Sequence, residues 1–277
     1  MTAKTLREVL NKANKKKYAV AGLVVLGWED ALAYTQAADE TSIPIILQAG
    51  PGCRKHTPVP ILGKMFRHLA DQTKTHIVCH IDHGYSFKEC LEGIDNGFNS
   101  VMFDGSKLPI RENIKLTSLI VKKAHAAGVS VEGEVGFVGY NKGTSSKLTK
   151  TEEAELFARE SGADAMAISI GNTHLQTKKI AKIDFNKLKE IENVTNIPLV
   201  LHGGSGIPSV VRKKLARNSN VAKFNIGTEL RMLFGNTIRK NISRNKKMYD
   251  RVELLKPTIN EMKKLSKKII SNIGPQF

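Results

Sequence analysis

Short apolar runs alternate with amphipathic stretches along most of this 277-residue chain. The runs are rich in β-branched and aliphatic residues and show no alternation of polar and apolar positions. This pattern is typical of parallel strands that are buried on both faces. It predicts strands at Ala19–Leu26, Ile43–Gln48, Ile77–His80, Ser100–Phe103, Ser130–Glu134, Ala165–Ile168, Pro198–Leu201 and Val221–Asn225.

The stretches between these runs read as helices. Residues 110–127 place apolar side chains on one face and lysines on the other, and Gly128 and Gly162 follow two such stretches as helix stops. Eight successive strand-helix units predict a single-domain α/β fold over residues 1–277, the (β/α)8 TIM barrel. We expect residues 1–14 to hold a helix that caps the bottom of the barrel, and residues 229–277 to form C-terminal helices. An open doubly wound sheet is the alternative, but it would not normally need eight successive strands.

Histidines and carboxylates stand at the ends of several predicted strands. His83, His174 and His202 fall just past apolar runs, and Asp104 and Glu134 close two others. In a barrel these strand ends meet at one mouth. Imidazole nitrogen and carboxylate oxygen suit zinc and its first-row neighbours, and a catalytic zinc usually keeps three protein ligands and one open position. The sequence therefore predicts a metal site at the mouth.

Glycine-rich segments follow the last two predicted strands. Residues 203–206 read Gly-Gly-Ser-Gly, and residues 225–228 read Asn-Ile-Gly-Thr. Barrels often bind phosphate in these two loops, where free backbone N–H groups and a helix dipole favour an anion. Arg231, one turn into the next helix, could hold a second phosphate or a carboxylate. We expect a phosphorylated small molecule as the substrate.

Charge and cysteine content restrict the partners and the compartment. The net charge of +17 would attract nucleic acid, but the lysines scatter over the predicted helices and lack the interleaved aromatics of a single-strand binding platform. We therefore expect neither a nucleic-acid nor a membrane partner. Nucleic-acid binding through the lysine-rich C-terminal segment is the alternative to this expectation. The apolar run at residues 18–26 is too short to span a bilayer. Three cysteines without a CxxC pair favour a reducing cytoplasm.

Five segments together resemble the zinc-dependent class II ketose-bisphosphate aldolases, which include fructose- and tagatose-bisphosphate aldolases. The segments are residues 80–84 (HIDHG), 100–106 (SVMFDGS), 131–136 (VEGEVG), 198–206 (PLVLHGGSG) and 225–230 (NIGTEL). The similarity runs in order over almost the whole chain. It implies reversible cleavage of a phosphorylated ketose, such as fructose 1,6-bisphosphate, to dihydroxyacetone phosphate and an aldehyde through a zinc-stabilised enediolate. A homodimer or homotetramer is also implied.

The resemblance implies a role for each site residue. His83, His174 and His202 look like the zinc ligands; Glu134 could join them when the metal shifts, and Asp104 lies near a second cation position. Asp82 looks like the general acid/base that exchanges a proton with the C4 hydroxyl. The residues that look like the dihydroxyacetone phosphate cradle are Gly203, Gly204, Ser205, Asn225, Gly227 and Thr228.

Several positions depart from the family pattern. The loop after the second strand reads Gln-Ala-Gly at residues 48–50, Leu175 replaces a usual glycine, and residues 139–143 lack the usual acidic groups. The first strand has Val24-Val25 where a Phe-Asn pair is common. These changes affect substrate recognition and leave a non-catalytic phosphosugar-binding barrel as an alternative. Schiff-base chemistry is not expected, because no lysine falls at a predicted strand end inside the mouth.

Overall fold

A computed structural model describes residues 4–140 and 143–276. Its eight parallel strands close into a barrel in chain order, with β8 paired to β1. The predicted α/β barrel is confirmed, although the first strand is shorter and the third longer than predicted. The strands are β1 (Val20–Val24), β2 (Ile45–Ala49), β3 (Ile77–Gly84), β4 (Ser100–Phe103), β5 (Ser130–Val135), β6 (Ala165–Ile168), β7 (Leu199–Leu201) and β8 (Val221–Ile226).

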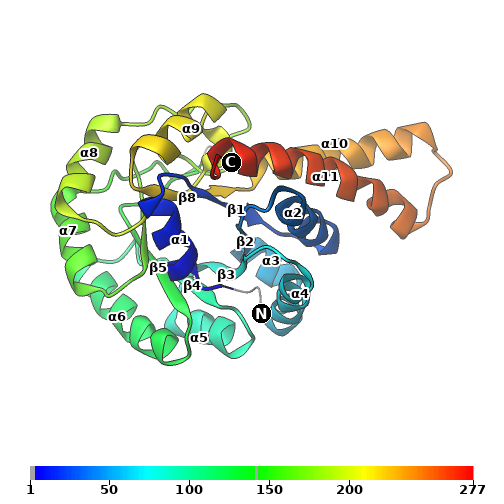
Figure 1. The fold of residues 1–277 in the computed structure, drawn as a ribbon. Coiled ribbons are helices and arrows are strands. Elements are labelled where there is room, and N and C mark those ends of the chain that lie inside the picture. Colours follow the sequence, from blue (N-terminus) through cyan, green and yellow to red (C-terminus); the bar gives the residue numbers. More distant parts are fainter. Residues whose placement is uncertain (1–3, 141–142, 277) are drawn as a thin grey trace.

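Helices follow the strands and surround the barrel (Figure 1). Their inner faces pack on the apolar outer faces of the strands in one large buried cluster, which explains why the strands carry no polar alternation. The helices around the barrel are α2 (Trp28–Thr41), α3 (Pro51–His56), α4 (Val59–Gln72), α5 (Phe87–Asp95), α6 (Ile110–Ala126), α7 (Thr151–Glu160), α8 (Phe185–Val194) and α9 (Ser209–Asn218), with a 3-10 turn η1 (Gly204–Gly206).

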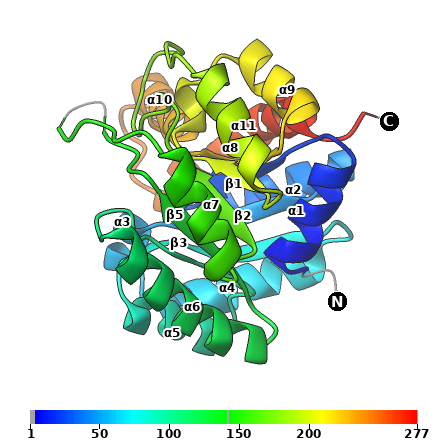
Figure 2. The same ribbon diagram turned by 90° about the vertical axis from the view of Figure 1, so that its left-hand side faces the viewer.

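Helix α1 (Leu6–Lys15) lies across one end of the barrel, at the right in Figure 2. It begins with a capping box, because the Thr5 side chain accepts from the Glu8 N–H and the Glu8 carboxylate accepts from the Thr5 N–H. Its buried face, which includes Leu6 and Leu10, joins the apolar side chains that fill the barrel interior in a second cluster. The floor of the barrel is therefore apolar and closed, and the cavity lined by Asp82, His83 and His174 lies at the opposite end.

Strand β3 is irregular where it reaches that opposite end. Its pairing with β4 shifts register between Ile81 and Gly84, and His83 takes a φ of 52°. Successive residues of a regular strand point to opposite faces, whereas a bulge re-aims side chains. Here both Asp82 and His83 face the mouth of the barrel.

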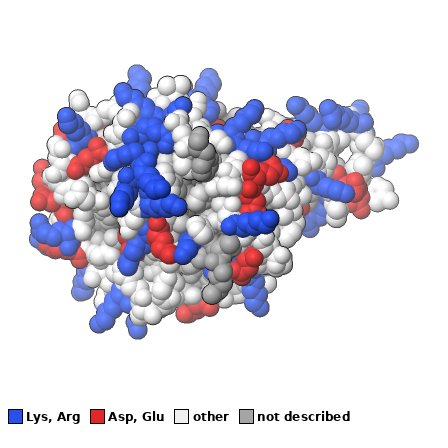
Figure 3. All heavy atoms as spheres, in the orientation of Figure 1, with Lys and Arg blue, Asp and Glu red and all other residues white. Residues whose placement is uncertain are grey.

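Helices α10 (Thr228–Arg244) and α11 (Arg251–Ile273) form a hairpin that extends beyond the barrel, at the right in Figure 1. Helix α11 packs on α2, where Glu40 accepts from Lys263 at 2.7 Å and from Lys267 at 2.8 Å. Lysine and arginine side chains spread over the barrel and this hairpin, with a denser group near α1 and α9 (Figure 3). Among the helices of the described residues, none is both long enough and apolar enough to cross a bilayer.

Candidate active site

A cavity of about 280 Å³ opens at the mouth of the barrel. His202 and Glu134 are not among its lining residues and are buried, with at most 1% of either residue exposed. Gly204 and Asp104 also lie outside the lining. The other predicted site residues all line the cavity, namely Asp82, His83, His174, Gly203, Ser205, Asn225, Gly227, Thr228 and Arg231.

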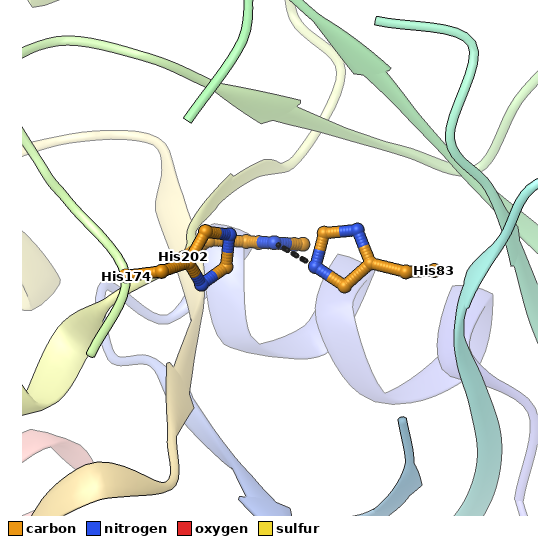
Figure 4. A group of neighbouring side chains, drawn as sticks. All are labelled: His83, His174 and His202. Atoms are coloured by element: carbon orange, nitrogen blue, oxygen red, sulfur yellow. Dashed lines mark hydrogen bonds between the residues drawn. The ribbon is translucent and has the colours of Figure 1, made fainter. Parts of the chain in front are cut away.

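The three histidines converge from different parts of the barrel. Figure 4 shows their rings turned toward one another, and one nitrogen of each lies within 4.8 Å of the others. The shortest separation joins His83 Nε2 and His202 Nδ1, at 3.0 Å. His174 comes from the segment after β6, and its backbone N–H donates to Gly139 O at 2.8 Å. The fold thus assembles three imidazole ligands that are far apart in the sequence.

Two carboxylates determine which ring nitrogen of His83 and which of His202 carries the proton. His83 Nδ1 donates to Asp104 Oδ2 at 2.8 Å, and His202 Nε2 donates to Glu132 Oε1 at 3.1 Å. Each ring then has its remaining nitrogen, an acceptor in the neutral imidazole, directed at the other ring. Two lone pairs at 3.0 Å would repel each other, so either a proton on His83 Nε2 or a metal ion must lie between them. The geometry fits a metal ion, because carboxylates behind ligating histidines are the usual support of a metal centre.

The acidic groups around His83 favour positive charge at this position. Burial alone lowers the pKa of His83, but the carboxylates of Asp82, Asp104 and Glu134 raise it to about 9. Burial and the Asp104 charge raise the pKa of Glu134 to about 8, and its Oε2 has no hydrogen-bond partner within the described part of the chain. Burial and the charge of His83 lower the pKa values of His174 and His202. His83, Asp104 and Glu134 form a second group with ligand atoms within 4.8 Å of one another.

Asp82 lies beside the histidines with one oxygen held in place. Asn225 Nδ2 donates to Asp82 Oδ1 at 3.0 Å, and Arg54 Nη1 donates to the Asp82 carbonyl at 2.6 Å. Burial raises the pKa of the Asp82 carboxyl, but the neighbouring imidazoles of His83 and His202 outweigh burial and lower it overall. Asp82 is therefore an ionised, oriented carboxylate that faces the cavity.

The glycine-rich loops bring backbone close to the cavity. Gly203 has a φ of 65°, and a Cβ there would lie 2.2 Å from Thr173 O, so only glycine fits. Gly227 is the N-cap of α10, and the Ser205 hydroxyl accepts from the Glu229 N–H of that helix at 3.2 Å. Gly204 begins η1 and does not reach the cavity. A helix N-terminus with free N–H groups suits an anion.

Some residues of the mouth were not predicted from the sequence. Tyr85 and Tyr140 line the cavity, and the Tyr140 ring stacks on His174 with centroids 4.9 Å apart. Leu175, which stands where the family pattern usually has a glycine, has a φ of 57° and is 46% exposed at the rim. Within the loop 139–143, Asn141 and Lys142 lie outside the described residues.

The sequence analysis also did not identify Lys223 as a residue of the site. It is fully buried inside the barrel on β8, and its ammonium group donates to Glu132 Oε2 at 2.5 Å. The period of two along a strand places Lys223 on the same face as Asn225, which was a usable signal. Lys223 is not among the residues that line the cavity.

The geometry agrees with comparisons to known proteins. The family model described as fructose-bisphosphate aldolase class-II matches residues 4–276. The chain belongs to the class-II fructose-bisphosphate aldolase family. A fructose-bisphosphate aldolase of Geobacillus stearothermophilus is 33% identical over 264 residues, which cover 93% of this chain and 92% of that protein. A 6-phospho-5-dehydro-2-deoxy-D-gluconate aldolase of Shouchella clausii is 34% identical, over 96% of this chain and 92% of that protein.

Solved structures give the same family. The YdjI aldolase of Escherichia coli K12 superimposes with a TM-score of 0.87 at 29% identity, covering 99% of this chain and 97% of that chain. This class-II aldolase is therefore an enzyme whose family acts on phosphorylated sugars and generally depends on a metal. Its histidine and carboxylate groups could hold such an ion.

Proposed function

We propose that this enzyme reversibly cleaves a phosphorylated ketose to dihydroxyacetone phosphate and an aldehyde, with a zinc ion held by His83, His174 and His202. The observation that carries the proposal is the pair of facing imidazole nitrogens, 3.0 Å apart, beside the ionised Asp82. When bound, the metal would polarise the ketose carbonyl and stabilise the negative charge that develops as the carbon–carbon bond breaks. Glu134, whose Oε2 has no hydrogen-bond partner among the described residues, and Asp104 would supply carboxylate oxygen at the same centre.

Asp82 would move the proton. Asn225 fixes Oδ1, so Oδ2 is left to accept the proton of the C4 hydroxyl in cleavage and to return it in condensation. The buried setting excludes bulk water from this exchange, since Asp82 is only 6% exposed. A positioned general base of this kind contributes about 10²- to 10⁴-fold to the rate.

The substrate phosphate would bind between the two glycine-rich loops. Gly203, Ser205, Gly227 and Thr228 line one side of the cavity, next to the N-terminus of α10. Backbone N–H groups and hydroxyls there are suited to the phosphate that stays on the dihydroxyacetone product.

Arg231 would bind the other end of the substrate. A second cavity of about 400 Å³ shares Val24, Leu26 and Arg231 with the first, and Arg251 also lines it. The carboxyl groups of Glu29 and Asp30 line this second cavity too. The guanidinium that would favour a second phosphate or a carboxylate on the aldehyde half is therefore Arg231, which lines both cavities. Val24 belongs to the Val24-Val25 pair that replaces the Phe-Asn pair of the family pattern, and it lines both cavities, so we propose that the accepted ketose is set in this region.

The test is cleavage of fructose 1,6-bisphosphate, tagatose 1,6-bisphosphate and fructose 1-phosphate, read as release of dihydroxyacetone phosphate. We expect activity on at least one sugar, loss of that activity in chelator, and recovery with zinc. Unchanged activity in metal-free protein would refute the metal-dependent mechanism. Tight sugar phosphate binding without cleavage of any of the three would support a non-catalytic phosphosugar-binding barrel instead.

We also propose a cytoplasmic homo-oligomer. The three cysteines are buried and unpaired, which suits a reducing compartment. The hairpin of α10 and α11 carries exposed apolar side chains, with Tyr249 at 93% and Val252 at 65% exposure. A second copy of the chain would cover this arm.

A further inference from the structure

A chain of buried polar groups runs through the barrel interior below the cavity. Lys223 Nζ donates to Glu132 Oε2 at 2.5 Å, and Glu132 Oε1 accepts from His202 Nε2 at 3.1 Å. The side chains of Lys223, Glu132 and His202 are all 0% exposed. They come from β8, β5 and the end of β7, so they connect across the barrel and not along one strand.

A second branch holds the lysine from its other side. Lys223 Nζ lies 3.4 Å from His80 Nε2, and His80 Nδ1 lies 2.7 Å from Ser100 Oγ. Burial and the Lys223 charge both lower the pKa of His80, so its ring is neutral and accepts from the ammonium group. Lys223 therefore has partners in β3 and β5, and its ammonium position is defined.

The orientation of His202 depends on this chain. Glu132 Oε1 accepts from His202 Nε2, so His202 directs Nδ1 at His83 Nε2, 3.0 Å away. Lys223 anchors the other oxygen of the same carboxylate, and this anchor fixes where Oε1 lies. Without it, the acceptor behind His202 would no longer be held in place, and the His202 ring would lose its orientation toward the metal position.

We infer that Lys223 is a positioning residue of the metal centre: by pairing with Glu132 it keeps an acceptor oxygen on His202 Nε2 and so keeps His202 Nδ1 free to bind the metal. The inference rests on the proposed metal-dependent function. It differs from that function in assigning a role to a lysine that does not line the cavity, and to Glu132, which lies outside both groups of possible metal ligands among the described residues.

The test measures metal binding directly. Zinc affinity of purified Lys223→Met, by competition with a chromophoric chelator, should fall about 10- to 100-fold, the usual effect of losing a group behind a metal ligand. The visible spectrum of the cobalt-substituted protein should change as well, because His202 no longer binds normally. Arg212→Met is the matched control, since Arg212 is another buried cation paired to a carboxylate, Glu229, on α9 and α10. It should keep wild-type zinc affinity and the wild-type cobalt spectrum.

Two double variants cover the case in which Lys223→Met fails to fold. Lys223→Met with Glu132→Gln, and Lys223→Met with Glu132→Leu, both remove the buried ion pair without leaving a lone charge. Only the glutamine keeps an acceptor oxygen for His202, so it should bind zinc at least tenfold more tightly than the leucine. Equal zinc affinity of the two, or wild-type affinity and spectrum in Lys223→Met, would overturn the inference.

Failure of the inference and failure of the proposed function give different results. If the wild-type protein binds zinc but cleaves no ketose phosphate, the proposed reaction is wrong, and the affinity comparison still tests Lys223. If the wild-type protein cleaves the sugar with zinc, and Lys223→Met binds zinc as tightly as wild type, only the positioning role is wrong.

Discussion

At the scale of single residues, the proposed chemistry depends on which nitrogen of each histidine carries the proton. Asp104 and Glu132 determine this for His83 and His202, since each carboxylate accepts from the nitrogen that faces away from the metal position. A histidine at a strand end in the sequence indicates a ligand, but not which nitrogen would bind. The acceptor behind each ring supplies that information.

Arg231 should discriminate between substrates with one and two anionic groups. It lines both cavities. Arg231→Met should raise KM for fructose 1,6-bisphosphate at least tenfold and change KM for fructose 1-phosphate less than threefold, because only the bisphosphate has a second charge to lose. An equal rise in KM for both sugars, in steady-state assays, would place Arg231 on the shared phosphate instead.

Asp30 should make the stability of the protein depend on pH. Burial raises its pKa to about 6, although it accepts from the Leu26 and Gly27 N–H groups. Its folded pKa lies above its unfolded value, so its contribution is fully favourable below about pH 4 and is lost as pH rises through 6. The Asp30→Asn variant has no carboxyl group at this position, so its stability does not fall for this reason as the pH rises. Its free energy of unfolding relative to wild type should therefore increase by about 1–3 kcal/mol between pH 4 and pH 7.

Urea unfolding across this pH range checks the Asp30 prediction. Asp71→Asn, at an exposed position on α4, is the control and should run parallel to wild type. A difference between Asp30→Asn and wild type that stays constant with pH would show that Asp30 ionises normally in the folded protein.

At the scale of secondary structure elements, the apolar pattern was sufficient to predict all eight strands and their order. Each strand is buried on both faces, so every run stands out from the lysine-rich helices between them. The irregularity in β3 was not predictable, because the bulge that turns both Asp82 and His83 into the mouth depends on pairing with β4. Lys223 was missed because a lysine inside an apolar run has no partner until the fold places Glu132 opposite it.

Helix α1 should contribute to stability as the floor of the barrel. Leu10 is fully buried and belongs to the cluster that fills the barrel interior. Leu10→Ala should lower the free energy of unfolding by about 2–5 kcal/mol, because it removes buried methyl groups and leaves a cavity. Leu119→Ala, at a position 47% exposed on α6, is the comparison and should cost less than about 1 kcal/mol in the same denaturant titration. Similar costs for the two would contradict a floor role for α1.

At the scale of the whole molecule, the chain separates an apolar, closed end from a polar, open end. The net charge of +17 is spread over the barrel and the hairpin, and the active site gathers its own carboxylates within this basic molecule. The positive electrostatic potential of the molecule would help to attract an anionic sugar phosphate. The family and the barrel followed from the sequence, whereas the hairpin's projection from the barrel is visible only in the structure (Figure 1).

The hairpin predicts how copies of the chain associate. Sedimentation velocity should show a dimer or tetramer for the wild-type protein and a monomer for Tyr249→Lys with Val252→Lys, because two charges would enter an apolar interface. Val210→Lys, at a 78% exposed position on α9, should keep the wild-type assembly. A monomeric wild-type protein would refute the proposed interface.

The most direct test of the whole account is single-turnover cleavage by zinc-loaded Asp82→Asn, with bound zinc measured in the same samples. Asparagine keeps the shape of Asp82 and its neighbours but cannot accept the C4 hydroxyl proton, so the account predicts normal zinc content with a cleavage rate about 10²- to 10⁴-fold lower than wild type. A near-normal rate with full zinc content would contradict the assignment of Asp82 as the acid/base and, with it, the proposed arrangement of the site.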